Sequence, residues 1–193
     1  MPTPLAHGLA GYAVLILAEP QLAGDLRGNL KALGAGFVFG TLADADFLVA
    51  YYTSNPALQH HYFSHSIPFA FLIGIVSYLF LRALKKTQAL RTALVLTAVY
   101  GTHLLLDYFT HDGSRPIGIP LFWPFTHKHL VAPVEIFASI HRGGMETLFG
   151  AHNFGALFRE ALILTPLALA AYFKSQKKIG VKPDRRIGEI KLK

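Results

Sequence analysis

Residues 103–113, HLLLDYFTHDG, place His103 and Asp107 four positions apart inside a run of leucines. Four positions make about one helical turn, so both side chains are expected on the same face of a helix. Ionisable groups in an apolar segment are costly unless they pair, line a wet cavity or bind a cation. Imidazole nitrogen and carboxylate oxygen are also the ligands that zinc takes at catalytic centres. This pair therefore points to a metal site.

The same residue types recur where other hydrophobic segments begin or end. A histidine opens the first segment, two aspartates stand in LADAD (42–46), and HHYFSHS (60–66) lies in a connection. Taken alone, each has a plainer reading as a helix cap, an interfacial histidine, a polar loop or a hydrogen-bonded pair. Together they favour a centre with one or two divalent ions, zinc being the first choice. The predicted ligands are His7, Asp44, Asp46, His60, His65, His103 and Asp107.

Three further residues are predicted to act beside these ligands. His61 is a candidate general base, a role that a ligating aspartate could also fill. Asp112, together with His111, could orient ligating imidazoles and is counted with the catalytic residues. Arg115 could hold an anionic part of a substrate, although an exposed loop arginine is the plainer reading. The histidines without a pattern are interpreted as interfacial: His127, His129, His141 and His152.

The composition indicates that these residues are positioned by membrane helices. The chain has 193 residues, of which 52% are hydrophobic and 15% are charged, whereas about a quarter of an ordinary soluble domain is charged. The absence of cysteine excludes disulfides and thiolate sites. An all-α, multi-span bundle of about five hydrophobic helices is predicted. The apolar segments are 4–18, 32–51, 67–84, 89–109 and 156–173.

A long connection between the fourth and fifth segments, residues 110–155, is expected to fold onto the site because plain connections are shorter. Residues 1–173 are predicted to form one membrane-embedded domain, followed by a basic cytoplasmic tail, 174–193. Beside apolar segments such a tail favours lipid headgroups over nucleic acid as its partner.

The distribution of charge predicts an orientation. Fourteen of the 18 Lys and Arg residues lie in or next to the first and third connections or in the tail, and all ten histidines belong to the opposite half. The positive-inside rule then places the tail in the cytoplasm and the N-terminus outside. The predicted centre would face the periplasm or the cell exterior.

The order of these motifs resembles the YdjM-like family of membrane-bound metal-dependent hydrolases. That family typically carries an N-terminal His, a Leu-Pro-Asp-x-Asp element, a His-Arg-Gly-x-Thr-His-Ser element and a Gly-x-x-Ser-His-x-x-Leu-Asp-x-x-Thr-x-x-Gly element. The chain departs from it at Ala43 for Pro, at His61 and Tyr62 for Arg-Gly, at Ser64 for Thr and at Thr102 for Ser. The matching residues are His7, Asp44, Asp46, His60, His65, Ser66, His103, Asp107, Thr110 and Gly113.

The resemblance implies a hydrolase with an all-helical arrangement akin to zinc-dependent phospholipase C. We expect an inner-membrane enzyme that cleaves a phosphoester or another ester in a small molecule or lipid. The main alternative is a transporter or ion pathway that uses the same His/Asp cluster, since ionisable groups in membrane segments also form relays. A haem carrier is disfavoured by the aspartates, and a structural protein with a decayed site is disfavoured by the surviving ligands.

Overall fold

The computed structural model describes residues 1–53, 61–111, 117–141 and 144–180, and it is almost entirely helical. Its elements, in chain order, are α1 (Pro4–Ala18), η1 (Pro20–Ala23), α2 (Leu26–Gly40), η2 (Leu42–Ala45), α3 (Asp46–Thr53), η4 (Phe63–His65), α4 (Ile67–Ala83), α5 (Ala89–Tyr108), β1 (Thr110–His111), β2 (Phe137–Ala138), α6 (Met145–Leu148) and α7 (Ala151–Lys178), where η marks a 3-10 turn.

Local sequence signals fix where the helices begin. The Thr3 side chain accepts a hydrogen bond from the backbone of Ala6, and a proline follows at the first position of α1. Asp25 caps α2 and Ser66 caps α4 in the same manner. Side-chain oxygens at these positions satisfy backbone N–H groups that the first helical turn leaves without partners. The helices therefore start where a short polar residue precedes an apolar run.

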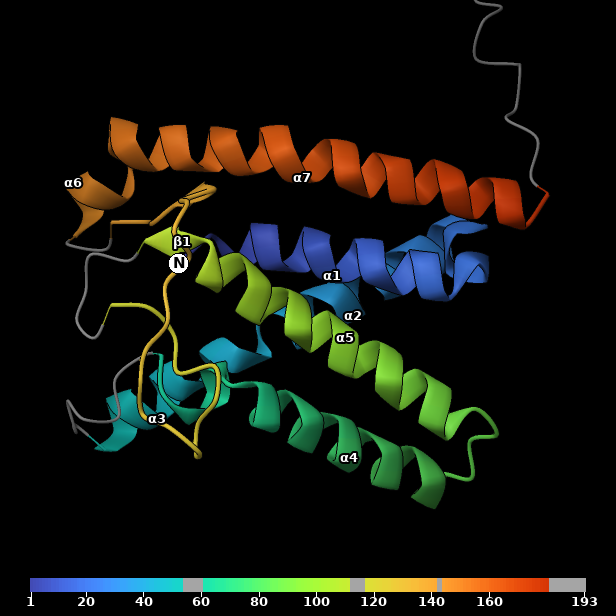
Figure 1. Cartoon of the computed structure of the whole chain (residues 1–193). Helices are drawn as coiled ribbons and strands as arrows, with labels where there is room; N and C mark the ends of the chain where they lie inside the picture. Colours follow the sequence, from blue (N-terminus) through green and yellow to red (C-terminus); the bar gives the residue numbers. More distant parts are fainter. Residues whose placement is uncertain (54–60, 112–116, 142–143, 181–193) are drawn as a thin grey trace, which may run out of the picture.

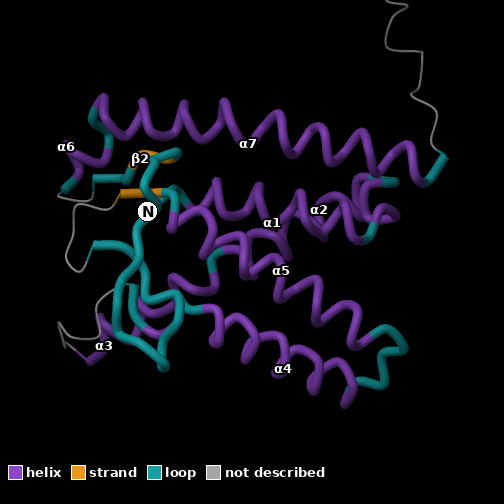
Figure 2. Tube along the Cα trace, in the orientation of Figure 1, coloured by secondary structure: helices purple, strands orange, loops and turns teal. Residues whose placement is uncertain are grey.

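The long helices lie side by side with α1 at the centre. Helix α1 packs against α2, α5 and α7, and α4 packs against α5 on the far side (Figure 1). The strands β1 and β2 pair in parallel and lie with long loops at the end of the bundle that carries the N-terminus (Figure 2). The turn between α4 and α5 lies at the opposite end (Figure 1). We call these the site end and the turn end.

The second predicted segment, 32–51, is not one helix, which corrects the sequence interpretation. Helix α2 stops at Gly40, the chain makes the 3-10 turn η2, and α3 begins at Asp46. Residues two apart in an α-helix point to nearly opposite sides. An unbroken helix would therefore direct Asp44 and Asp46 to opposite sides, whereas the 3-10 turn brings both carboxylates close to His65.

The other predicted segments agree more closely with the observed helices. Segments 4–18, 67–84 and 89–109 correspond to α1, α4 and α5 within about one residue. Helix α7 is longer than the predicted 156–173 at both ends. It begins at Ala151, inside the predicted connection, and it extends to Lys178, so the first residues of the predicted tail are helical. There Ser175 is buried and donates its hydroxyl hydrogen to the carbonyl of Ile16 at 2.7 Å.

Within the described residues, two helical stretches are long and apolar enough to cross a membrane, namely α5 and the 34-residue stretch Met145–Lys178. Helices α1 and α4 are apolar but shorter. Large apolar side chains on the outer faces are exposed, among them Phe71, Phe80, Leu94 and Leu162. Such faces are typical of a lipid environment rather than of a soluble monomer. The count of five spans remains a prediction.

The connection after α5 packs onto the site end. Ile119 is fully buried, and it exchanges backbone hydrogen bonds with Leu130. Its side chain packs with Tyr100 and Leu104 of α5 in one apolar cluster. The described part of the connection is therefore folded and covers the helix ends, as expected from its length.

Candidate metal centre

His103 and Asp107 lie on one face of α5, as their spacing predicts, and both are buried. His103 Nε2 is 3.0 Å from Asp107 Oδ2. His103 Nδ1 lies 2.7 Å from the carbonyl oxygen of Gly40, at the end of α2. Because a carbonyl only accepts hydrogen bonds, Nδ1 carries the hydrogen and Nε2 presents a lone pair to the centre in the neutral ring.

His65 is oriented in the same way by a carboxylate. Its Nδ1 lies 3.2 Å from Asp46 Oδ2 and 3.0 Å from Ser64 Oγ. The Ser64 hydroxyl donates to Asp46 at 2.9 Å, so both neighbours of Nδ1 act as acceptors. The buried Tyr100 hydroxyl donates to the Ser64 carbonyl at 2.6 Å and holds this turn against α5. His65 Nε2 therefore also faces the centre with a lone pair.

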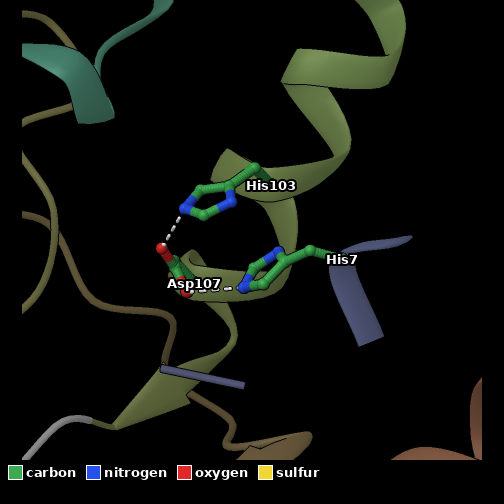
Figure 3. A group of neighbouring side chains, drawn as sticks. All are labelled: His7, His103 and Asp107. Carbon is green, nitrogen blue, oxygen red and sulfur yellow. Dashed lines mark ion pairs between the residues drawn. The ribbon is translucent and has the colours of Figure 1, made fainter. Parts of the chain in front are cut away.

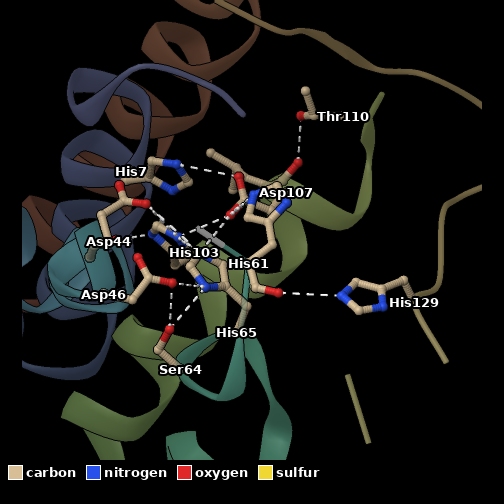
Figure 4. A network of polar contacts seen from close by, with 12 residues as sticks. His7, Asp44, Asp46, His61, Ser64, His65, His103, Asp107, Thr110 and His129 are labelled. Carbon is tan, nitrogen blue, oxygen red and sulfur yellow. Dashed lines mark hydrogen bonds and ion pairs between the residues drawn. The ribbon is translucent and has the colours of Figure 1, made fainter. Parts of the chain in front are cut away.

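Four acceptor atoms converge at the centre (Figure 4). His65 Nε2 and His103 Nε2 are 3.2 Å apart, and His65 Nε2 is 3.4 Å from Asp107 Oδ2. Asp44 Oδ1 lies 3.8 Å from His65 Nε2 and 3.6 Å from His103 Nε2. When both imidazoles are neutral, lone pairs and carboxylate oxygens this close repel one another. A cation among them removes that repulsion.

The spacing of these atoms fits a metal ion. When four ligands surround one zinc ion tetrahedrally at about 2.0–2.1 Å, neighbouring ligand atoms are about 3.3–3.4 Å apart. The separations that involve His65 Nε2 or His103 Nε2 run from 3.0 to 3.8 Å. The donor set of two imidazoles and two carboxylates also suits zinc and similar divalent ions. The residues present therefore fit a metal.

His7, from the first turns of α1, adds a fifth group (Figure 3). It is fully buried, and its ring stacks on that of His103 with centroids 3.9 Å apart. Its Nε2 lies 3.7 Å from Asp107 Oδ1. Among the residues that the structure describes, neither ring nitrogen of His7 has a hydrogen-bond partner. A buried imidazole in that state is costly and points to a ligand that the ring would bind.

His61 faces the other side of the same carboxylate. Its Nε2 lies 3.7 Å from Asp107 Oδ2, and its side chain is 5% exposed. His61 has a φ of 69°, in the left-handed region that non-glycine residues rarely adopt. Strained backbone of this kind is concentrated at functional sites. Asp107 thus lies between His7 and His61, an arrangement that could serve one ion or a pair of ions.

Close packing of α1 on α2 brings these residues together. A Cβ added to Gly40 would lie 2.6 Å from the His7 carbonyl oxygen, and one added to Gly36 would lie 2.5 Å from the Tyr12 nitrogen. Only glycine permits these approaches. The result is that the end of α2, which holds His103, touches the backbone of His7.

Helix α7 contributes by holding the start of α1. Glu160 is buried and accepts hydrogen bonds from the backbone and hydroxyl of Thr3, at 2.8 and 2.5 Å. Thr3 is the residue that caps α1, four positions before His7. Glu160 therefore stabilises the start of α1 and acts on the position of His7 only through Thr3.

The structure brings together most of the predicted residues, but not all of them. His60, Asp112 and Arg115 lie outside the described residues, so their predicted roles remain predictions. Asp46 lies behind His65, on the Nδ1 side, rather than among the converging atoms. Thr110 bonds back to the Leu106 carbonyl. Of the patternless histidines, His129 approaches the His61 carbonyl at 3.4 Å, and His141 stacks on His152 elsewhere.

Three residues that support the site have weak sequence signals. Gly40 acts through its carbonyl, which depends on helix packing and leaves no mark in the sequence. Ser64 lies in the HHYFSHS motif, but the sequence indicates no role for its side chain. Tyr100 lies three positions before His103 and hence near the same helix face. Its hydroxyl group, in an apolar segment, could therefore have indicated that it supports the site.

These features define a helical membrane protein with a buried His/Asp cluster that could hold a metal ion. The chain belongs to the YdjM inner membrane protein family, whose model matches residues 1–179. It is 31% identical over 111 residues to the inner membrane protein YbcI of Escherichia coli strain K12. That alignment covers 55% of this chain and 61% of the relative, so less than two thirds of YbcI is matched. No solved structure matches the chain at a significant level. Membership in this family implies a lipid bilayer setting.

Proposed function

We propose that this protein is a membrane-bound metal-dependent hydrolase that cleaves a phosphoester or another ester at the membrane boundary. The observation that carries the proposal is the convergence of His65 Nε2, His103 Nε2, Asp44 Oδ1 and Asp107 Oδ2 at ligand-like separations. A divalent ion held by them, with zinc the first choice, would supply Lewis acidity to an ester oxygen and would lower the pKa of a bound water.

The chain's own residues have distinct tasks in this proposal. The Gly40 carbonyl and the Asp46 carboxylate fix the rings of His103 and His65, so that no reorientation is needed during the reaction. His61 would accept and return a proton at Nε2, with Asp107 stabilising the charged ring. Arg115, outside the described residues, is proposed to hold an anionic group of the substrate.

Access to the centre is proposed on the side of Asp44. The side chain of Asp44 is 14% exposed, whereas those of His65, His103 and Asp107 are 0% exposed. An open edge at one ligand suits a centre that must admit an ester and a water molecule while its other ligands stay shielded. A closed structural site would bury all of its ligands alike.

An enzyme explains the architecture better than an ion pathway. The cluster lies at one end of the bundle, and the neighbouring core toward the turn end contains Leu15, Ile16 and Val99. An ion route across the membrane needs polar groups or water along its length. This apolar core instead isolates the cluster from the opposite end.

The test combines metal analysis with an activity screen. Protein purified in detergent without chelators should contain a divalent metal and should hydrolyse at least one member of a panel of phosphoesters and carboxylic esters. His103→Ala should lose both properties. His152→Ala, which removes an exposed histidine of α7, should keep them. Wild-type protein with less than about a tenth of an equivalent of metal would remove the basis of the proposal.

A further inference from the structure

A continuous apolar groove follows the seam between α4 and α5. Its larger part, about 330 Å³, is lined from Thr97 to Tyr108 on α5 and by Ile67, Ala70 and Phe71 of α4. A smaller part, about 140 Å³, continues it toward the turn end and shares Phe71 and Thr97 with the larger part. The two cavities therefore form one groove along the paired helices.

Among the described residues, the middle of the groove presents no polar group that an occupant would have to hydrogen-bond. The hydroxyl of Thr97, the one hydroxyl in its middle, donates to the carbonyl of Ala93 on the same helix. Phe71 and Leu105 line its sides and are more than half exposed. A Cβ added to Gly101 would meet nothing within 4 Å, so this position opens into the groove. Such a groove suits a hydrocarbon chain.

The larger, wide part of the groove ends level with the candidate metal centre. Tyr108, which lines that end, follows the ligand Asp107 in the chain, and Leu104 follows His103. Ile67 comes two positions after His65. The apolar cluster that includes Ala43, next to the exposed edge of Asp44, also includes Ala70 and Leu104 of the groove. An occupant of the groove would therefore have one end beside the proposed access to the centre.

The length of the wide part matches one lipid leaflet. The eleven steps from Thr97 to Tyr108 correspond to about 16 Å of helix rise. The hydrocarbon core of a bilayer is about 30 Å thick, so one leaflet contributes about 15 Å. A lipid with its ester group at the level of Asp107 would thus place its acyl chain along the groove.

We propose that the groove between α4 and α5 binds the acyl chain of the substrate, which makes that substrate a membrane lipid whose ester lies at the His/Asp cluster. The chemistry at the ester rests on the proposed hydrolase function. Occupancy of the groove by an acyl chain does not rest on it, because burial of apolar surface is sufficient for binding. The two ideas can therefore fail separately.

The experiment uses a phosphatidylglycerol whose acyl chain carries a diazirine, in vesicles that contain the full-length protein. Three proteins are compared: wild type, Gly101→Leu, which fills the groove, and Gly34→Leu, whose added side chain also meets open space but lies on α2. Photolabelling of the peptides around Phe71 and Thr97–Tyr108 is expected in wild type and Gly34→Leu. We expect a decrease of about tenfold in Gly101→Leu, the factor that loss of about two buried methylenes produces.

Other labelling patterns overturn the proposal. Equal labelling over all exposed apolar faces, unaffected by Gly101→Leu, would mean ordinary surrounding lipid only. Groove peptides that stay unlabelled in a dimeric protein would assign the groove to a second copy. Metal content of the variants serves as the measure of correct folding.

A second arm separates the groove from the chemistry. Gly101→Leu should raise KM for a long-chain phospholipid while leaving kcat/KM for p-nitrophenyl phosphate unchanged, and Gly34→Leu should change neither. If no protein hydrolyses any ester but the label still maps to the groove, the hydrolase proposal fails and the lipid site stands. Equal sensitivity of both substrates to Gly101→Leu would contradict the acyl-chain assignment.

Discussion

The Nε2 atoms of His65 and His103 face each other at 3.2 Å although the Nδ1 atom of each ring is turned to an acceptor. If both rings are neutral, the lone pairs of the two Nε2 atoms point at each other. The contact is favourable only with a positive charge between or on the rings, from a proton or a metal ion. The groups that hold the two rings, the Gly40 carbonyl and the Asp46 carboxylate, therefore increase the affinity of the centre for a cation.

The first prediction separates the two aspartates of the LADAD motif. Asp46→Asn should weaken metal binding by about 10–100-fold, because the ring of His65 loses the carboxylate that fixes it. Asp44→Asn should weaken it further, because it replaces a converging carboxylate with a neutral amide, which is a poorer ligand. Metal titration of the two purified variants measures the difference. A larger effect at Asp46 than at Asp44 would show that Asp46 itself binds the metal.

Glycine packing between α1 and α2 provides the second prediction. Gly40→Ala should destabilise the protein by about 1–3 kcal/mol and reduce its metal content, because the new methyl group overlaps the His7 carbonyl. Gly34→Ala on the same helix is the matched control, since its Cβ meets open space. Thermal unfolding in detergent and elemental analysis compare them. Equal stability of the two variants would contradict the packing argument.

Much of the fold could be predicted because apolar length and composition decide it locally. Helices α1, α4 and α5 begin and end close to the predicted segments. The break between α2 and α3 lies inside one predicted segment, although the aspartates of LADAD could be interpreted as a helix cap there. At this break Gly40 packs against the backbone of His7, a contact between residues far apart in the chain that the sequence does not reveal.

The candidate site was predictable to a similar extent. The spacing of His103 and Asp107 places them on one helix face in any helical fold. Asp44 and Asp46 look equivalent in sequence. Only the 3-10 turn places an oxygen of Asp44 among the converging atoms and the carboxylate of Asp46 behind His65. The contribution of the Gly40 carbonyl to the orientation of His103 was invisible for the same reason, since every residue has a carbonyl.

The third prediction concerns pH. Burial lowers the pKa of His65, but Asp107, Asp44 and Asp46 outweigh burial and raise it well above its ordinary value of 6.5. At neutral pH the metal-free protein therefore holds a proton on His65, which a metal ion must displace. Metal affinity should rise with pH above 6.5, by about tenfold per pH unit, and level off once the pH exceeds the raised pKa.

Competition titrations with a metal chelator across this range measure the dependence. Asp46→Asn, which removes one of the carboxylates that raise the pKa of His65, should flatten the slope at the upper end of the range. An affinity that stays constant above pH 6.5 would mean that His65 carries no proton in the metal-free protein.

The fourth prediction tests His61 as the proton acceptor. His61→Gln should lower kcat by about 10²–10⁴-fold, the usual contribution of general acid–base catalysis, while most of the metal is retained. His65→Gln should lose metal and activity together because its ring is one of the converging ligands. Loss of metal in His61→Gln equal to that in His65→Gln would make His61 a ligand instead.

The last prediction concerns the side of the membrane on which the centre lies. Fourteen of the 18 basic residues are expected in the cytoplasm, which places the site end outside. Lys128 lies near the site end, next to the His129 that approaches His61, and Lys86 lies in the turn between α4 and α5. Both are exposed, and the chain has no cysteine of its own. In spheroplasts, Lys128→Cys should react with a membrane-impermeant thiol reagent, whereas Lys86→Cys should react only after permeabilisation. The reverse pattern would place the centre at the cytoplasmic face, and equal labelling of both variants in intact spheroplasts would contradict a bundle that spans the membrane.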